Sequence, residues 1–332
     1  MDTQSKSERF IGNEHSKNTA ATRVGIEIII PVLNEEDTIG GVIDDISKLG
    51  DKEFVVSIVV IDGGSTDDTI NICKHKNVKL VFQKGKGKGN AMKEAVETHT
   101  TADIVVFMDG DGTYPVSELK SIVLPVLQDD ADMVVGSRIM GKKEKGALAV
   151  FNSFGNKIFN KSINFAMKSS VTDSLSGYRA LYRKTFRDLV LFSDSFDIEV
   201  EMTVEALSQG YRVLEIPISY GARKGDSKSK LHPINDGVKI AKTLLFILMN
   251  VNPLKFFSVI ALAFFAAGMY PGAYVLHEKI TTGEIVSMPS VVFSSLLFVT
   301  GTTSLVVGML SELVVRSRRR LEYLLKKNHF GN

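Results

Sequence analysis

Asp109 and Asp111 are the residues in this sequence whose types and spacing most clearly indicate chemistry. They lie one residue apart at the end of an apolar run, residues 103–108, which predicts a buried strand. Two carboxylates in this position can share one hard divalent cation, which completes its shell with substrate phosphates. Asp-x-Asp also occurs in ordinary turns. We predict that Asp109 and Asp111 hold Mg²⁺ or Mn²⁺, which requires phosphate-binding groups nearby.

Polar residues also lie at the ends of the first two predicted strands, residues 24–32 and 54–61. The first is followed by Pro31-Val-Leu-Asn-Glu35, in which Asn34 and Glu35 present polar groups. The second is followed by Asp62-Gly-Gly-Ser65. A carboxylate such as Asp62 can accept hydrogen bonds from a base or a ribose hydroxyl. These residues are therefore candidate ligand contacts.

A glycine- and lysine-rich run follows the third predicted strand. It reads Lys84-Gly-Lys-Gly-Lys-Gly89. Glycines permit close approach of the backbone to a phosphate, and lysines add positive charge. The spacing differs from that of a Walker P-loop. We interpret the run as a phosphate-binding loop that includes Lys84.

The elements that must position these residues alternate between strand and helix. Strands are expected at residues 24–32, 54–61, 78–82, 103–108 and 133–136, and helices at residues 36–49, 66–75, 89–98 and 117–127. Such alternation predicts an α/β fold with a mostly parallel sheet. Ligands of these folds bind beyond the carboxyl ends of the strands, where the polar motifs fall.

Composition excludes several classes of protein. The chain has 332 residues with 40 basic and 38 acidic side chains, so no nucleic-acid partner is indicated. Its one cysteine, Cys73, excludes an internal disulfide and a cysteine-rich metal site. Residues 1–23 are polar and without periodicity, which predicts a flexible tail.

The C-terminal part is strongly apolar. Residues 256–276 and residues 288–310 contain no charged side chain, and each run is long enough to cross a bilayer. We predict a transmembrane hairpin over residues 253–315; two buried core helices are the alternative. Residues 233–252 carry lysines on one side and apolar residues on the other, which predicts an amphipathic helix at the membrane surface.

Flanking charge predicts the orientation of this hairpin. A basic tail, residues 316–332, follows the second span, and three lysines precede the first. The loop between the spans is short and nearly neutral. Because basic flanks stay on the cytoplasmic side, we expect a multi-pass membrane protein whose large domain and both termini are cytoplasmic.

Taken together in this order and spacing, Pro31-Val-Leu-Asn-Glu35, the run that begins at Asp62, and Asp109-Gly-Asp111 resemble the family 2 glycosyltransferases, which have a GT-A fold. The resemblance covers about residues 24–240. It implies a GT-A domain over residues 24–232 that binds a nucleotide-diphosphate sugar. It further implies that Glu35 and Asp62 lie near the base and ribose, and that Asp109 and Asp111 hold the metal on the diphosphate.

Later motifs resemble those of the polyprenyl-phosphate (dolichol-phosphate) sugar synthases. The motifs are Gly136-Ser-Arg138, Asp173-Ser-Leu-Ser-Gly-Tyr-Arg179, Arg223-Lys-Gly-Asp-Ser-Lys-Ser-Lys-Leu231 and Asp236-Gly237. The resemblance implies that four residues bind the phosphates of donor and acceptor, namely Arg138, Arg223, Ser227 and Lys230. For Arg179, an ion pair with Asp173 is an equal alternative to a functional role.

Two departures from that group bear on the donor. Mannosyl-transferring members commonly have Gln where this chain has Thr113, which favours a UDP-sugar over GDP-mannose. Members often have an Arg before a Gly-Asn pair, whereas here Ser153 and Phe154 precede Gly155. The missing charge could come from Lys142, Lys143 or Lys145.

The implied function is transfer of a sugar, such as glucose or N-acetylglucosamine from its UDP donor, to dolichyl or polyprenyl phosphate, giving a lipid-linked sugar for protein or envelope glycosylation. The alternatives are a GDP-mannose-using synthase, a membrane transferase with a saccharide hydroxyl as acceptor, and a non-catalytic scaffold. Expected partners are the nucleotide-sugar, the lipid phosphate and membrane lipid, with homo-oligomerisation left open.

Glu199 and Glu201 bear on the nature of the acceptor. A hydroxyl acceptor needs a general base, and either carboxylate could supply it, although we favour a structural or acceptor-positioning role for both. A phosphate monoester is largely dianionic at neutral pH and needs no strong base. Catalysis would then rest on positioning and charge stabilisation by Asp111, Arg138 and Arg223.

Arg223→Lys is predicted to lower turnover by about 10²-fold, because a lysine cannot reproduce the two-pronged grip of a guanidinium on a phosphate. Nucleotide affinity should change little, since base and ribose are assigned to Glu35 and Asp62. Steady-state rates and nucleotide titration of the same variant check this. An equal fall in nucleotide affinity would assign Arg223 to the donor.

Overall fold

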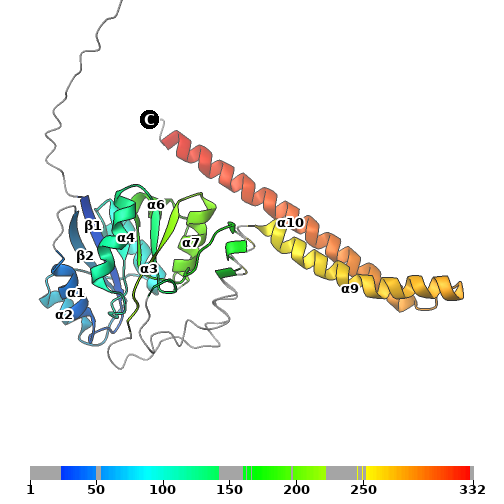
Figure 1. Ribbon diagram of the computed structural model, residues 1–332, viewed down its shortest axis with the longest axis horizontal. Helices are drawn as coiled ribbons and strands as arrows, with labels where there is room; N and C mark the ends of the chain where they lie inside the picture. Colours follow the sequence, from blue (N-terminus) through cyan, green and yellow to red (C-terminus); the bar gives the residue numbers. More distant parts are fainter. Residues whose placement is uncertain are drawn as a thin grey trace, which may run out of the picture.

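The computed structural model describes residues 24–49, 54–141, 160–221 (apart from 162, 166 and 196), 245, 249 and 252–329. The predicted tail over residues 1–23 and the predicted amphipathic segment up to residue 251 lie almost wholly outside this part of the chain. An α/β domain is followed by two long helices that project away from it (Figure 1).

One seven-stranded sheet forms the centre of the α/β domain, in the order β3-β2-β1-β4-β6-β5-β7. Its strands are β1 (Val24–Val32), β2 (Phe54–Asp62), β3 (Lys79–Phe82), β4 (Ile104–Phe107), β5 (Met133–Ser137), β6 (Arg179–Tyr182) and β7 (Val213–Pro217). β1, β2, β3 and β4 pair in parallel, as do β5 and β7. The prediction of a mostly parallel sheet is confirmed.

β6 is the exception, since it lies antiparallel between β4 and β5. The sequence did not predict β6 or β7, whose short runs contain the charged residues Arg179 and Glu215. β6 brings Arg179 opposite Phe107, close to the end of β4. The antiparallel strand thereby connects the second half of the chain to the sheet edge where the polar motifs lie.

Helices cover both faces of the sheet. They are α1 (Ile39–Ser47), α2 (Thr69–His75), α3 (Lys88–Glu94), the π-helical turn η1 (Ala95–His99), the 3₁₀ turn η2 (Val116–Glu118), α4 (Leu119–Leu127), α6 (Arg183–Asp188) and α7 (Ile198–Ser208). The elements up to residue 127 lie at the four predicted helices, with α3 and η1 together forming the third, whereas α6 and α7 were not predicted.

Alternation along β1 explains the two layers. Ile28 and Ile30 belong to the core shared with α1, α2 and α4, whereas Ile29 belongs to the core shared with α3, η1, α6 and α7. Successive side chains of a strand point to opposite faces, so a strand that is apolar throughout must be covered on both.

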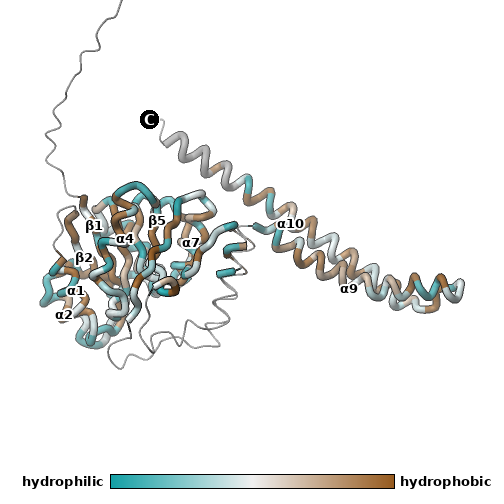
Figure 2. Tube along the Cα trace, in the orientation of Figure 1, coloured by the Kyte–Doolittle hydropathy of each residue, from teal (hydrophilic) through white to brown (hydrophobic). Residues whose placement is uncertain are grey.

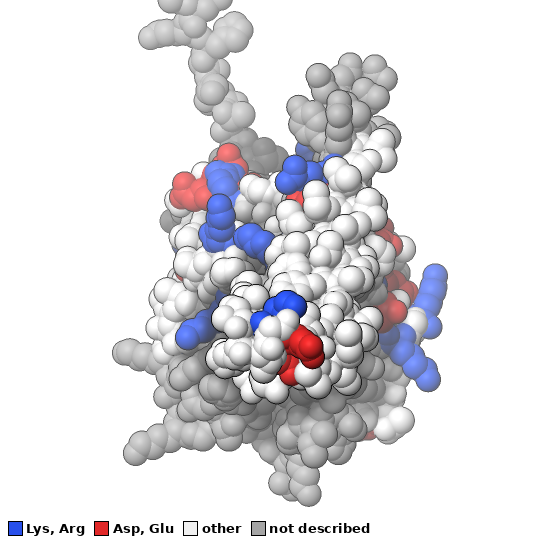
Figure 3. Space-filling view, turned by 90° about the vertical axis from the view of Figure 1, so that its right-hand side faces the viewer, with Lys and Arg blue, Asp and Glu red and all other residues white. Residues whose placement is uncertain are grey.

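The two C-terminal helices are α9 (Pro253–Thr282) and α10 (Met288–His329). Both contain a window of mean hydropathy 1.8, of which only 11% and 17% is buried. Brown tracts run along both helices in Figure 2, and the side of the molecule that Figure 3 presents has broad uncharged areas between scattered charges. The low burial disfavours the alternative of soluble core helices and makes both helices candidate membrane spans.

Small residues bring α9 and α10 together. The Ser294 hydroxyl donates to the carbonyl oxygen of Gly268 at 2.9 Å. A Cβ at Gly301 would come within 2.6 Å of the Phe265 ring. Close helix contact through small residues and interhelical hydrogen bonds is the packing mode of helices in lipid.

Gly87→Ala is predicted to lower the free energy of unfolding by about 3 kcal/mol or more, because residue 87 has φ +91° and its Cβ would lie 2.0 Å from the carbonyl oxygen of Asp194. Gly210→Ala is the matched control, since φ there is +81° with open space around it, and only the strain of about 1–2 kcal/mol applies. Denaturant unfolding of the two variants measures the difference. Equal losses would show that the contact with Asp194 carries no weight.

Candidate active site

The polar motifs converge because parallel strands end at one edge of the sheet. Pro31 pairs with Ile61 and Val32 with Asp62, so the loops after β1 and β2 leave the sheet side by side. β4 lies on the other side of β1, and Asp109 follows it by two residues. The structure therefore brings together the three segments that the sequence placed at strand ends.

The loop after β1 is joined to the loop after β2. The Asn34 backbone N–H donates to Ser65 Oγ at 2.9 Å, and the Thr66 N–H donates to Asn34 Oδ1 at 2.8 Å. Asn34 has φ +54°, a conformation that asparagine tolerates better than most residues. The Glu35 N–H donates to Thr69 Oγ1 at 2.8 Å. These hydrogen bonds fix the loop after β1 against the segment that follows β2.

Asp62 shapes the loop that follows it. Its side chain is buried, and the carboxylate accepts hydrogen bonds from the N–H groups of Gly64 at 2.9 Å and Ser65 at 3.0 Å. The carboxylate therefore holds the turn in place. Its contact with a base or ribose stays a prediction, as do the ligand contacts of Pro31, Asn34, Glu35 and Ser65.

Asp109 and Asp111 lie in the turn beyond β4. Asp111 is 5% exposed and accepts from the Thr113 hydroxyl at 2.6 Å, while the Asp109 side chain is 29% exposed. No group of three or more His, Cys, Asp or Glu with metal-binding geometry occurs within the part of the chain that the structure describes. Two carboxylates fit a hard cation that takes its remaining ligands from substrate oxygens.

Lys88, at the start of α3, bridges two carboxylates. Its Nζ lies 2.5 Å from Asp109 Oδ1 and 2.6 Å from Glu199 Oε1. Burial lowers the pKa of Lys88, but the charges of Asp109 and Glu199 outweigh it, so that the pKa is raised above its ordinary value. The ammonium is therefore charged and ties α7 to the predicted metal site.

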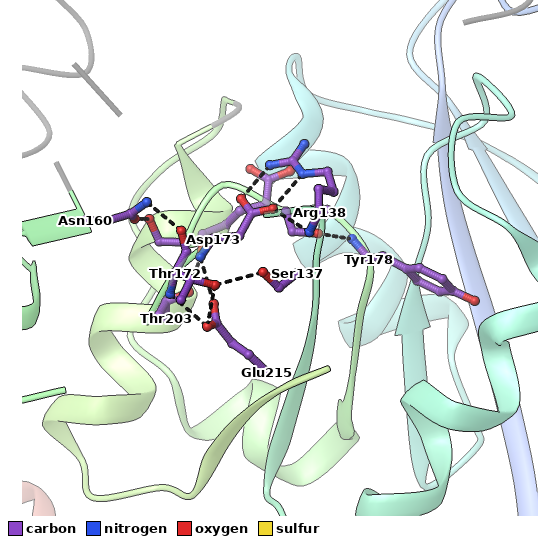
Figure 4. Close-up of polar contacts among 12 residues, drawn as sticks. Ser137, Arg138, Asn160, Thr172, Asp173, Tyr178, Thr203 and Glu215 are labelled. Carbon is purple, nitrogen blue, oxygen red and sulfur yellow. Dashed lines mark hydrogen bonds and ion pairs between the residues drawn. The ribbon is translucent and has the colours of Figure 1, made fainter. Parts of the chain in front are cut away.

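Arg138 lies in a buried polar network (Figure 4). Its Nε and Nη2 each donate to Asp173 at 2.8 Å. The Thr172 and Asp173 backbone N–H groups donate to the Glu215 carboxylate of β7 at 2.7 and 2.8 Å. Glu215 thus fixes the position of residues 172 and 173, and Asp173 in turn binds Arg138. Phosphate binding by Arg138 stays a prediction.

The suggested Arg179–Asp173 ion pair is not what the structure shows, because Asp173 pairs with Arg138 instead. Arg179 is fully buried and donates to the carbonyl oxygens of Ser174 and Ser176 and to Thr203 Oγ1. Burial lowers the pKa of Arg179 to about 10, against the opposing charges of Glu199 and Asp173. Arg179 therefore has a structural role in joining β6 to α7.

Tyr114 connects the predicted metal motif to this network. Its hydroxyl accepts from the Gly177 N–H at 2.9 Å, and its ring packs against Tyr178 and Tyr220. The Arg138 guanidinium lies 5.4 Å from the centre of the Tyr220 ring. Burial raises the pKa of the Tyr114 hydroxyl well above its usual range. Tyr114 therefore remains a neutral hydrogen-bonding group.

Glu199 and Glu201 on α7 are both engaged. Glu199 is 3% exposed and pairs with Lys88. The Glu201 carboxylate accepts from the N–H groups of Phe192 and Ser193 at 2.9 and 2.8 Å. Burial raises the pKa of Glu201, although these hydrogen bonds oppose the change. Both contacts agree with a structural or positioning role.

Two glycines of the glycine- and lysine-rich run have a packing role. A Cβ at Gly89 would lie 2.5 Å from the carbonyl oxygen of Ser193, and one at Gly87 would meet Asp194. These glycines make room for residues 193–195, and phosphate binding by the run stays a prediction. Lys84 donates its backbone N–H to Glu94 at 3.0 Å and lines an open depression of about 450 Å³ beside α3.

Three predicted contacts, Arg223, Ser227 and Lys230, lie outside the described residues, as do Lys142, Lys143 and Lys145. Sequence reasoning missed Lys88 and Tyr114 as site residues. Lys88 is one of several lysines in its run, and its type alone does not single it out. The available signal was its position at the start of α3. Tyr114 follows the predicted metal motif by three residues, where an aromatic residue gives no chemical signal of its own.

Comparison with known proteins identifies the class. Residues 27–190 match the profile described as "Glycosyl transferase family 2". Glycosyltransferase AglJ of Haloferax volcanii is 36% identical over 298 residues, covering 88% of this chain and 94% of the relative. The chain belongs to glycosyl transferase family 2 and is a glycosyltransferase.

Further relatives agree with this class. The dolichyl-phosphate hexose transferase of Haloferax volcanii is 31% identical over 222 residues, covering 66% of this chain and 92% of the relative. Glucosyl-3-phosphoglycerate synthase from Mycobacterium tuberculosis, crystallised with Mn²⁺, UDP and glucosyl-3-phosphoglycerate, superposes with a TM-score of 0.54 at 24% identity, over 68% of this chain and 80% of that one. The predicted GT-A fold is confirmed.

Asp173→Asn is predicted to lower the free energy of unfolding by about 3–5 kcal/mol, because it leaves the buried Arg138 guanidinium without its counter-charge. Asp132→Asn is the control: it removes a partner of the half-exposed Arg212 and should cost about 1 kcal/mol or less. Chemical denaturation of both variants tests this. Losses of similar size would mean that burial of the Arg138 pair has little energetic effect.

Proposed function

We propose that this glycosyltransferase moves a sugar from a nucleotide-diphosphate donor, a UDP-sugar, onto the phosphate of a polyprenyl lipid at the membrane surface. The observation that carries the proposal is the sequence of parts along one chain: a carboxylate pair at a sheet edge lined with cations, followed by two helices apolar enough to cross a bilayer. An acceptor that resides in the bilayer explains why the catalytic domain is tethered to it.

The relatives support this assignment. The match to AglJ covers more of the chain than residues 1–252 could supply, so it extends into the helical hairpin. The name of the second relative assigns it hexose transfer involving dolichyl phosphate. The structural neighbour was crystallised with UDP and a divalent metal, and Thr113 in place of the Gln of mannosyl-transferring members favours a UDP donor here.

Asp109 and Asp111 would hold Mg²⁺ or Mn²⁺, which when bound supplies positive charge to the leaving diphosphate. Their hard oxygen donors and the partial exposure of Asp109 fit such an ion. Arg138, held by Asp173, and Arg223 would orient the acceptor phosphate for a single displacement that inverts the anomeric centre.

The carboxylates of α7 favour a phosphate over a hydroxyl acceptor. A hydroxyl must lose its proton to a base within hydrogen-bond reach. Glu199 is nearly buried and already paired with Lys88, and Glu201 is used by the backbone of residues 192 and 193. A phosphate dianion needs no such base.

The remaining assignments belong to the same proposal. Residues 24–232 form the cytoplasmic catalytic domain, residues 253–315 span the membrane twice, and residues 316–332 return to the cytoplasm. Ser227 and Lys230 assist Arg223 at the lipid phosphate, and Lys84 contacts the donor. The product is a lipid-phosphate-linked sugar available for glycosylation of protein or of envelope components.

Asp111→Asn is predicted to abolish transfer, by about 10³-fold or more, while leaving the fold intact, because one of two metal carboxylates is lost. Membranes containing the full chain are incubated with polyprenyl phosphate and each of a panel of radiolabelled UDP- and GDP-sugars, with and without EDTA. Asp129→Asn, at an exposed position, is the control and should transfer normally.

Label from a UDP-sugar in an acid-labile lipid product, lost in EDTA, supports the proposal. Label from GDP-mannose in the lipid product would show that the donor is GDP-mannose and not a UDP-sugar, and it would leave the lipid-phosphate acceptor unchanged. Label that appears only when a saccharide acceptor is added would overturn the lipid-phosphate assignment. Full activity of Asp111→Asn would overturn the role of the carboxylate pair.

A further inference from the structure

Lys88 pairs with two carboxylates that differ in their exposure to solvent. It contacts one oxygen of Asp109 and one oxygen of Glu199 at nearly equal distances, 2.5 and 2.6 Å. The Asp109 side chain is 29% exposed, whereas that of Glu199 is 4% exposed. A single ammonium is therefore shared between one carboxylate that solvent and ligands can reach and one that is nearly buried.

Glu199 has capacity for a closer contact with Lys88. Its Oε2 atom is buried and has no hydrogen-bond partner among the residues that the structure describes. Leaving a buried acceptor in this state is energetically unfavourable. The charge of Glu199 acts on Arg179, but the hydrogen bonds that Arg179 donates go to Ser174, Ser176 and Thr203.

A divalent cation at Asp109 would repel the ammonium that now contacts the same carboxylate. Two positive charges a few ångströms apart in a partly desolvated site are strongly unfavourable. Lysine has a flexible stem of four carbons and can shift its charge without moving the backbone. The orphan Oε2 of Glu199 offers that charge a second acceptor on the same carboxylate.

We propose that Lys88 is an internal counter-ion of the metal site, and that Glu199 is the positioning residue that receives it when a metal binds. In the metal-free enzyme Lys88 neutralises Asp109 and competes with the metal. When the cation binds, Lys88 moves fully onto Glu199 and satisfies both of its oxygens. This inference rests on the metal role of Asp109 and Asp111 in the proposed function.

The competition has a consequence for the order of binding. A site that must first displace an ammonium binds a bare metal weakly, and a nucleotide diphosphate that brings oxygen ligands with it restores the affinity. The enzyme would therefore take up metal chiefly together with its donor.

Mn²⁺ binding to the detergent-solubilised full chain tests the inference without any turnover, with free Mn²⁺ measured by electron paramagnetic resonance. Lys88→Met should tighten binding of Mn²⁺ in the absence of nucleotide by about tenfold, because the competing charge is gone. Glu199→Gln should weaken it by about tenfold, because Lys88 then has no alternative acceptor. Glu201→Gln, on the same helix but away from Lys88, is the control and should bind Mn²⁺ as the wild type does.

The double variant separates displacement of Lys88 from simple loss of negative charge. In the Lys88→Met background, Glu199→Gln should have little further effect, since there is no ammonium left to receive. The double variant also removes both charges of the buried pair, so it remains informative if Lys88→Met alone fails to fold. It must bind Mn²⁺ more tightly than Glu199→Gln alone.

An equal effect of Glu199→Gln in both backgrounds, or a double variant no tighter than Glu199→Gln, would overturn the inference and leave the proposed function standing. Wild-type protein that binds no Mn²⁺ even with UDP would overturn the metal role itself, and the inference with it. The two failures are therefore distinct.

Discussion

Buried positive charge at the carboxyl edge of the sheet is the constraint on which the rest of the site depends. Arg138, Arg179 and Lys88 are all nearly inaccessible to solvent. An unpaired charge in such a place is strongly unfavourable, so each needs a partner of good geometry. The partners, among them Asp173 and Glu199, come from segments far along the chain. These ion pairs therefore help to fix how the later segments of the domain pack against the earlier ones.

That arrangement suits a reaction in which both reactants carry phosphate. An arginine fixed by packing and by a carboxylate, as Arg138 is by Asp173, needs no reorganisation when further negative charge arrives. Arg138 is held on one side by Asp173 and faces the Tyr220 ring, and the segment that carries Asp173 is itself held by Glu215. The geometry of the edge thus depends on carboxylates that are engaged by other groups of the protein. A glycosyltransferase of this kind depends on its buried acidic residues as much as on its cations.

Local patterns were sufficient to predict the first half of the domain. Apolar runs bounded by polar motifs predicted β1 to β5, and β4 in the middle of the sheet is apolar throughout because it is buried on both faces. The same reasoning could not find β6, whose four residues include the buried Arg179, or the choice of Arg138 as partner of Asp173. Those features depend on which distant segments meet. The space around Gly87 is a further case, since its neighbour, Asp194, is 107 positions along the chain.

The hairpin geometry bears on orientation independently of charge. Gly308 of α10 lies against Leu254 and Phe257, at the start of α9. Beyond that level α10 continues to His329, and Figure 1 shows its end extending past the start of α9. With about 1.5 Å per residue, α10 is about 63 Å long, roughly twice the hydrocarbon thickness of a bilayer. If both helices span, the end of α10 must therefore emerge on the side from which α9 enters, which is the side of the catalytic domain. The basic residues that begin at Arg316 fall in that end, so a spanning hairpin places them on the same side of the membrane as the catalytic domain, which is the arrangement that flanking charge predicts.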